Sequence, residues 1–236
     1  MADLLSVRNL CSGYGHIPVL HDVSFSLPRE GVSAIIGPNG HGKTTLLRTL
    51  SGLNRSWSGQ IEFDGAPIPQ SVEARARAGL VHVPQGDQLF MDMTVMENLA
   101  MGAYARPKGY DLQTGFAEVF DLFPRLAERR QQRVSSLSGG ERRMVGIGRG
   151  MMAGGKLLMI DEPSLGLAPI VIEQVYDALR KLASTGAAIL VVEENPSRIE
   201  TVAERFFLMD GGKFEWTGDT EALRNSSDIV ATYLGG

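Results

Sequence analysis

The sequence is short of cysteine, of long apolar runs and of positive charge. Among its 236 residues there is one cysteine, Cys11, which excludes an internal disulfide and fits a reducing compartment. The longest apolar runs, such as Ala187–Val192 and Leu157–Ile160, fall far below the roughly 20 residues that a membrane-spanning helix needs. The formal net charge is −4, which argues against a general nucleic-acid binder with a strongly basic face.

The first ten residues lack a basic segment ahead of an apolar stretch and contain the acidic Asp3, so we expect no secretory signal. Apolar residues make up 43% of the chain and charged residues 21%, which is ordinary for a globular protein. A chain of this length can bury a full core. We therefore expect an α/β protein of the cytoplasm.

Short runs rich in β-branched residues alternate with glycine and proline turns, as is typical of strands. Between residues 86 and 152 the pattern changes to helices with polar loops. Gly211 and Gly212 are expected to join Phe206–Asp210 to Lys213–Trp216 in a hairpin, with a short helix after Asp219. The remaining expected strands are Leu4–Leu10, Val19–Leu27, Val32–Ile36, Gln60–Asp64, Gly79–Val83, Lys156–Ile160 and Ala187–Val192, and the helices are Thr94–Tyr104, Leu112–Phe123, Pro124–Gln132, Glu141–Met152 and Pro169–Ser184.

A phosphate-binding loop follows the third expected strand. Its glycines allow several backbone N–H groups to point at one anion, and the helix that begins near Lys43 adds its positive end. Lys43 should reach the β- and γ-phosphates of a nucleoside triphosphate, and the Thr44 hydroxyl should hold Mg²⁺. The expected phosphate site comprises Gly37, Pro38, Asn39, Gly40, His41, Gly42, Lys43, Thr44 and Thr45.

Two carboxylates end the apolar strand before residue 161. Asp161 would hold Mg²⁺ beside Thr44, and Glu162 would activate the attacking water, as phosphoryl transfer requires. A nucleotide kinase can use the same two motifs, so these residues alone do not select hydrolysis.

A third anion-binding pattern lies between these two motifs. Ser138 offers a hydroxyl, Gly139 and Gly140 expose N–H groups, and a helix begins near Glu141. The run Leu137-Ser138-Gly139-Gly140-Glu141 resembles the signature of ATP-binding-cassette (ABC) ATPases, and it lies in the chain order typical of that family.

This resemblance covers essentially the whole chain and implies a P-loop core of ABC-ATPase type. It predicts one domain over residues 1–236, with an antiparallel β subdomain, an α/β core of 1–85 and 153–236, and a helical subdomain of 86–152. Tyr14 matches the aromatic residue that stacks on adenine, and a plain loop tyrosine is the alternative. Gln85 matches the glutamine that contacts Mg²⁺ and reports to the membrane partner, so the implied catalytic set is Glu162, Lys43 and Gln85, and the implied metal ligands are Thr44, Gln85 and Asp161.

Finer features resemble the ATPases of branched-chain amino acid importers and their urea or short-chain amide relatives. The resemblance implies a second ABC ATPase subunit (a copy or a sister chain), two permease subunits and, indirectly, a substrate-binding protein. It also implies a peripheral position on the cytoplasmic face of the inner membrane, with no nucleic acid as partner. The segments that carry it are Leu122–Leu126, Glu162–Pro169, Val192–Asn195 and Tyr233–Gly236.

Three departures from the family pattern stand out. Ala168 replaces a common aspartate, Arg142 and Arg143 follow the signature where glutamines are common, and Glu194 occupies the position of the switch histidine. A carboxylate near a γ-phosphate is repelled unless it is protonated or turned away, so Glu194 puts in question turnover at this chain's own P-loop. The alternative is that Glu194 faces solvent or pairs with Arg198.

Three functions remain open from the sequence. The first is an importer ATPase that docks on permeases through 86–94 and the helices after it. Leu89, Phe90 and Met91 are either part of the helical core or available to that partner. The second is a soluble ABC ATPase of translation or DNA repair, although those proteins generally carry two cassettes or long coiled-coil insertions. The third is an ATPase of lipid or polysaccharide export.

Overall fold

The computed structural model describes residues 3–86 and 88–226, so the Tyr233–Gly236 segment lies outside the described residues. An antiparallel sheet at one end contains β1 (Leu5–Tyr14), β2 (Ile17–Leu27), β4 (Ser56–Phe63) and β5 (Ala66–Pro67), in the order β2-β1-β4-β5. Gly15, at a φ of 58°, makes the tight turn from β1 into β2 and leaves Tyr14 at the end of its strand.

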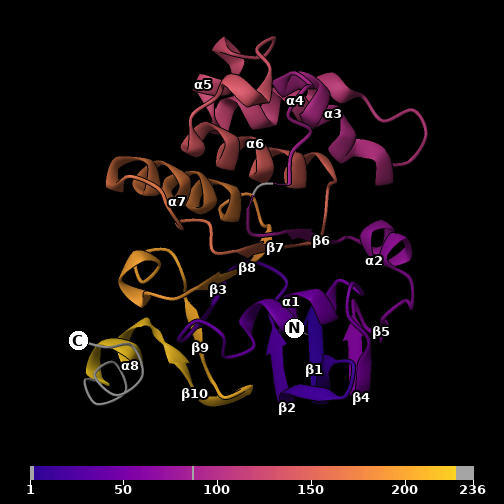
Figure 1. The fold of residues 1–236 in the computed structure, drawn as a ribbon, viewed down its shortest axis with the longest axis vertical. Helices are drawn as coiled ribbons and strands as arrows, with labels where there is room; N and C mark the ends of the chain where they lie inside the picture. Colours follow the sequence, from indigo (N-terminus) through magenta and orange to yellow (C-terminus); the bar gives the residue numbers. More distant parts are fainter. Residues whose placement is uncertain (1–2, 87, 227–236) are drawn as a thin grey trace.

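A second sheet crosses the middle of the molecule in the order β10-β9-β3-β8-β7-β6 (Figure 1). Strands β9, β3, β8, β7 and β6 run parallel to one another and β10 is antiparallel to β9, so the carboxyl ends of the five parallel strands meet at one edge. The phosphate loop, Gln85, Asp161 and the Glu193–Glu194 pair each follow or end one of these strands. The strands are β3 (Gly31–Ile36), β6 (Leu80–Val83), β7 (Leu157–Asp161), β8 (Ala188–Glu193), β9 (Arg205–Asp210) and β10 (Lys213–Asp219).

Helix α1 (Lys43–Leu50) packs in the core between the two sheets. Leu46, Leu47 and Leu50 are fully buried there together with residues of both sheets. The short helix α2 (Val72–Ala78) was not expected from the sequence, because its alternating arginines and alanines carry little apolar periodicity. Its Arg75 donates to the carbonyls of Thr49 and Leu50 and so caps the end of α1.

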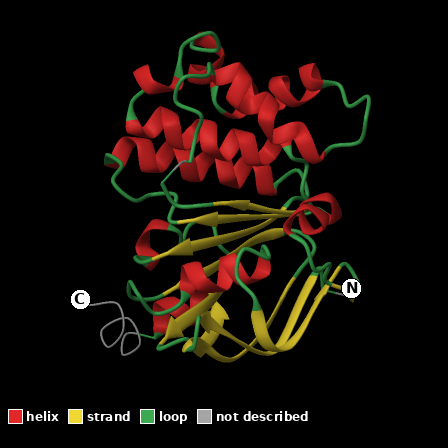
Figure 2. Cartoon of the chain, turned by 45° about the vertical axis from the view of Figure 1, so that its right-hand side comes forward, coloured by secondary structure: helices red, strands yellow, loops and turns green. Residues whose placement is uncertain are grey.

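The helices α3–α6 lie together beyond the sheet, and α7 (Pro169–Ala183) runs between them and the strands (Figures 1 and 2). Their apolar faces share one core with the adjacent face of the central sheet. These elements are α3 (Val95–Gly102), the 3-10 helix η1 (Ala103–Ala105), α4 (Leu112–Leu122), α5 (Pro124–Glu128), the 3-10 helix η2 (Val134–Ser136) and α6 (Gly139–Met152).

Two helix boundaries differ from the sequence prediction for identifiable reasons. Helix α5 ends at Glu128 because the carbonyls of Arg130 and Gln132 accept hydrogen bonds from the first turn of α3. Helix α6 begins two residues early, at Gly139, because Ser138 is its N-cap.

The C-terminal part contains the 3-10 helix η3 (Pro196–Arg198), the β9–β10 hairpin and α8 (Thr220–Asn225), which Asp219 caps. Within the described residues, no helix is both long enough and apolar enough to cross a membrane.

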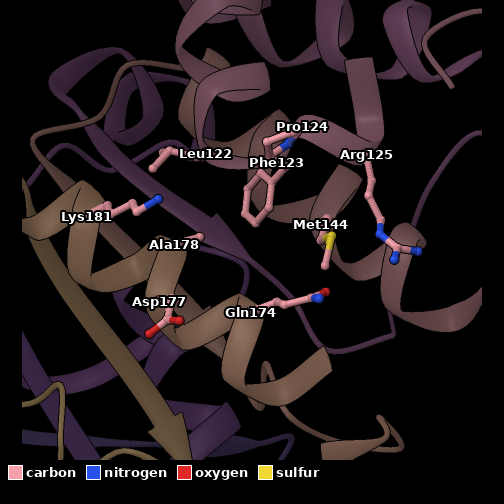
Figure 3. A pocket seen from close by; sticks show the side chains of 9 residues that line it. All are labelled: Leu122, Phe123, Pro124, Arg125, Met144, Gln174, Asp177, Ala178 and Lys181. Atoms are coloured by element: carbon pink, nitrogen blue, oxygen red, sulfur yellow. The ribbon is translucent and has the colours of Figure 1, made fainter. Parts of the chain in front are cut away.

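A cavity of about 290 Å³ lies where α7 meets the α4–α5 turn (Figure 3). Phe123 and Met144 form apolar walls, and Arg125, Asp177 and Lys181 supply charged ones. This cavity is remote in sequence from the phosphate loop and contains none of the predicted site residues.

Candidate active site

The phosphate loop leaves β3 in a conformation that three glycines permit. Gly37, Gly40 and Gly42 have φ values of 144°, 83° and 104°, a region that side chains disfavour. A Cβ on Gly37 would lie 2.1 Å from the Met209 carbonyl oxygen of β9, whereas a Cβ on Gly40 would meet nothing within 4 Å. The loop therefore packs on the sheet at its start and is open on the side where an anion would approach.

Lys43 is held inside this loop rather than extended to solvent. Its side chain is 4% exposed, and its ammonium donates to the carbonyls of Gly37 and Pro38 at 2.6 and 2.8 Å. Burial lowers the pKa of Lys43, and the nearby carboxylates, Glu162 first among them, oppose that shift. The loop carbonyls thus hold a buried cation at the position where phosphate oxygens are expected.

The Asp161 carboxylate is buried beside the Thr44 hydroxyl, and among the described residues no group makes a hydrogen bond of good geometry to it. Its side chain is 1% exposed, and both of its oxygens are unpaired among the described residues. Burial raises the pKa of Asp161, while the Thr44 hydroxyl and the charges of Lys43 and Arg143 act in the opposite direction. A buried, unsatisfied carboxylate beside a hydroxyl is the donor arrangement that suits a Mg²⁺ ion, which takes one or two carboxylates and completes its shell with water and phosphate.

Glu162 lies directly after Asp161 and lines the cavity beside the phosphate loop. Its backbone has a φ of 46°, unusual for a residue with a Cβ, and the Gln85 amide donates to its carboxylate at 2.9 Å. Burial raises the pKa of Glu162; Lys43 lowers it, and the other acidic groups raise it further. Gln85 and Glu162 come from strand ends that are 77 residues apart in the sequence.

A cavity of about 320 Å³ brings half of the predicted site residues together. Its lining consists of Asn39, Gly40, Gly42, Lys43, Thr44, Thr45, Gln85, Glu162 and Leu165.

Tyr14 lies next to this cavity, beyond the first turn of α1. Its hydroxyl is 3.3 Å from the Thr45 hydroxyl, and the Arg48 guanidinium lies 5.9 Å from its ring centre. The ring is exposed. This position would suit a side chain that contacts the base of a nucleotide whose phosphates lie in the loop.

Two contacts that were not predicted from the sequence join the phosphate loop to other elements. The Asn39 amide donates to the Glu194 carboxylate at 2.9 Å. His41 Nδ1 lies within hydrogen-bond distance of Asp210, in the β9–β10 hairpin. Arg198, the alternative partner considered for Glu194, donates to the Ser164 hydroxyl instead. Partners 155 and 169 residues apart leave no signal in local sequence spacing.

The signature residues lie apart from this cavity, at the start of α6. Ser138 and Glu141 form a reciprocal capping box, in which the serine hydroxyl accepts from the Glu141 N–H and the glutamate carboxylate accepts from the Ser138 N–H. Gly139 is exposed, whereas a Cβ on Gly140 would lie 2.5 Å from a methyl of Val171 in α7. One glycine keeps the helix end accessible and the other permits close packing.

A buried carboxylate, Glu193, holds the loop that follows Glu162. It accepts hydrogen bonds from the backbone N–H and hydroxyl of Ser164 and from the Tyr176 hydroxyl. Glu193 was not predicted as a functional residue, because in the sequence it only ends an apolar strand beside Glu194. This network fixes the path of residues 164–167 against α7 and β8.

Comparison with known proteins agrees with this geometry. Residues 20–165 match the ABC transporter family. The branched-chain amino acid transport ATP-binding protein BraG of Pseudomonas aeruginosa is 39% identical over 99% of this chain and 100% of its own length. LptB of Haemophilus influenzae, a lipopolysaccharide export ATP-binding protein, is 32% identical over 98% of this chain and 97% of its own.

A solved ATP-binding cassette of an ABC transporter superposes with a TM-score of 0.88 at 26% identity, covering 97% of each chain. The fold is therefore the expected α/β ABC-ATPase cassette with an antiparallel sheet. The chain belongs to the ABC transporter family and is one of its ATP-binding, ATP-hydrolysing cassettes.

Proposed function

We propose that this chain is the ATPase subunit of an importer, and that it drives uptake of branched-chain amino acids or related small polar solutes through separate permease subunits. The observation that carries the hydrolytic part is that one cavity contains Lys43, Gln85 and Glu162, directly beside the buried carboxylate of Asp161. The assignment to import draws on the resemblance to BraG along the whole chain.

In this proposal each residue of the cavity has one task. The loop N–H groups and Lys43 bind the β- and γ-phosphates, and Tyr14 packs on the adenine. Glu162 accepts a proton from the attacking water, and the Gln85 amide, 2.9 Å away, orients its carboxylate. A base must be ionised to act, and the neighbouring Lys43 favours that form against the effect of burial.

Thr44, Gln85 and Asp161 would hold Mg²⁺. The ion would neutralise charge on the phosphate oxygens. The fit rests on the two buried oxygens of Asp161, which have no hydrogen-bond partner of good geometry among the described residues and would be satisfied by a cation or its water.

The position of the signature supports a dimer as the working unit. Ser138, Gly139 and Gly140 do not line the cavity of their own chain, and Ser138 and Gly139 are exposed. We propose that they complete the ATP site of a second ABC ATPase, either a copy or a sister chain. ATP would then hold the two chains together, and hydrolysis would release them.

The permease contact is proposed at a groove beside Gln85. A cavity of about 440 Å³ there is lined in part by His82, Phe90, Met101, Tyr104 and Arg149. Phe90 is 46% exposed and Tyr104 86% exposed, which leaves large apolar surface uncovered. Docking here would place the chain at the cytoplasmic face of the inner membrane, with a substrate-binding protein reached only through the permeases.

Export is the second candidate, because LptB covers the same length at 32% identity. An uptake assay separates the two. In a strain that lacks the gene, the wild-type chain should restore uptake of labelled leucine, isoleucine or valine, whereas the Lys43→Ala chain should not. If the permeases that co-purify support no uptake, and loss of the gene changes only the surface lipids, export is correct.

A further inference from the structure

Arg143 connects the signature helix to the backbone of the proposed catalytic base. It lies on α6, five residues after the signature serine, and is only 3% exposed. One guanidinium nitrogen donates to the Glu162 carbonyl at 2.7 Å, and another donates to the Pro84 carbonyl at 3.4 Å. The buried guanidinium of Arg143 therefore contacts the backbone just before Gln85 and the backbone of Glu162, to which the Gln85 amide donates.

Glu162 needs such a contact because its backbone is in a disfavoured conformation. A φ of 46° in a residue with a Cβ persists only where the surroundings hold it in place. The Glu162 N–H donates to the Val192 carbonyl at 2.9 Å, and Arg143 binds the carbonyl on the other side of the same residue. The two contacts fix the direction in which the carboxylate points, and Gln85 then meets it.

We propose that Arg143 is a positioning residue for hydrolysis, which holds the Glu162 backbone and the start of the Gln85 segment in one geometry. The proposal rests on the role of Glu162 as the base. Arg143 belongs to the helix whose first turn is the signature. In the proposed dimer the signature completes the partner's ATP site, whereas Glu162 belongs to the chain's own site, so the Arg143 contact links residues of the two sites.

The test uses the full chain and measures ATP affinity, KM and kcat separately. Arg143→Gln removes the charge and shortens the reach, so the Glu162 carbonyl loses its partner. We expect kcat to fall on the order of 10- to 100-fold, because small misplacement of a reacting group has effects of this size. KM and the affinity for a fluorescent ATP analogue should stay within about twofold, because Arg143 does not line the phosphate cavity. Arg143→Lys should recover part of the kcat.

Arg75→Gln is the matched control for loss of a buried arginine. Arg75 also donates to backbone carbonyls, those of Pro69, Thr49 and Leu50, but it lies outside the active site. Its substitution should lower the melting temperature and leave kcat of the folded protein near that of wild type. Equal kcat losses in the two variants, an unchanged kcat in Arg143→Gln, or a parallel loss of ATP affinity would each overturn the proposal.

A double-variant cycle shows whether Arg143 acts through Glu162. In the Glu162→Gln background, measured in single turnovers, Arg143→Gln should cause no further loss, because the group it positions is already absent. A further loss of tenfold or more would place its action elsewhere and refute the proposal. If Glu162→Gln alone keeps wild-type kcat, Glu162 is not the base, and the proposal for Arg143 is wrong as well. That result differs from the one in which Glu162→Gln loses activity and Arg143→Gln does not.

Discussion

Single side chains in the active site are placed in surroundings that would be unfavourable without a ligand. Lys43 is a buried cation held by two carbonyls of its own loop, and Asp161 is a buried carboxylate with no partner among the described residues. Burying an unpaired charge is costly, and such arrangements concentrate at functional sites. We therefore expect both residues to lower the stability of the nucleotide-free protein and to gain favourable contacts when nucleotide and Mg²⁺ bind.

Replacing Lys43 with alanine should remove the charged contact to the β- and γ-phosphates. Charge-assisted hydrogen bonds contribute about 1.5–3 kcal/mol each, so ATP affinity should fall by roughly 10- to 100-fold or more. Equilibrium titration with a fluorescent ATP analogue measures this. Lys156→Ala, which removes an exposed lysine paired with Asp64, is the control and should bind normally. Unchanged affinity in Lys43→Ala would disprove the phosphate-loop assignment.

Replacing Asp161 with asparagine should stabilise the protein in the absence of nucleotide while abolishing Mg²⁺-dependent turnover. Burial raises the folded-state pKa of Asp161, so its ionised form destabilises the fold at pH values above that pKa. Stability therefore falls as pH rises from the unfolded pKa through the folded pKa, and the penalty is complete above the folded pKa.

Removing that charge should raise the melting temperature by about 2–4 °C, on the basis of about 1 kcal/mol in a chain of this size. Thermal scans at pH 7 with EDTA would measure it. A lower melting temperature in Asp161→Asn would mean that the carboxylate has a stabilising partner.

How far the residues could be assigned from sequence depended on the distance between partners. The phosphate loop, the acidic strand end and the signature are local patterns, and the structure places each at the end of the element expected for it. The Asn39–Glu194 and Arg143–Glu162 contacts join residues from separate elements, so no spacing rule indicates them. The Glu193 network was missed because a buried carboxylate at a strand end looks like any other acidic residue in sequence.

Among the elements, the parallel strands determine where the active site forms. Each of β3, β6, β7 and β8 is short and apolar, which makes it recognisable in sequence, and the sheet then aligns their carboxyl ends. Helix α2 was missed because its stabilisation comes from tertiary contacts of Arg75 rather than from an apolar face. Tertiary capping likewise decided the end of α5.

The loop before α3 carries a prediction about docking. Leu89 packs against the helical core, whereas Phe90 and Met91 are exposed, and Asn98 fixes the Phe90 backbone through its N–H and carbonyl. Phe90→Asp should therefore leave folding and ATP binding intact but prevent co-purification with the permeases. Leu112→Asp, on an exposed apolar residue of α4 outside the groove, is the matched control and should assemble normally. A large drop in the melting temperature of Phe90→Asp would show that the ring is part of the core.

For the whole molecule, the separation of the signature from its own cavity predicts that nucleotide controls association. Glu162→Gln should retain ATP because the phosphate contacts remain, and kcat should fall on the order of 10²- to 10⁴-fold because the base is lost. With ATP and Mg²⁺ this variant should elute as a dimer, with itself or with a sister ATPase, during size exclusion. The Glu162→Gln, Lys43→Ala double variant is the control and should stay monomeric. Wild-type turnover in Glu162→Gln would remove Glu162 as the base.

In a heteromeric transporter, we expect the two ATP sites to differ in their rates of hydrolysis. The site built on this chain's Lys43 has Glu194 where the family commonly has a histidine, and Glu194 accepts a hydrogen bond from Asn39 of the phosphate loop. A carboxylate held there opposes a γ-phosphate. A sister site with the histidine would instead use this chain's intact Ser138-Gly139-Gly140 and should hydrolyse faster.

Glu162→Gln in this chain should therefore reduce transport ATPase activity less than the matching change in the sister. Glu194→His should not reduce the activity and would raise it if the carboxylate is what slows the site. Asn39→Ala is a second test, because it frees Glu194 without changing its charge: if the hydrogen bond holds the carboxylate against the phosphate, this variant should turn over faster at this chain's own site. Equal activity losses from the two Glu→Gln variants, or a fully active homodimer of this chain, would contradict the asymmetry.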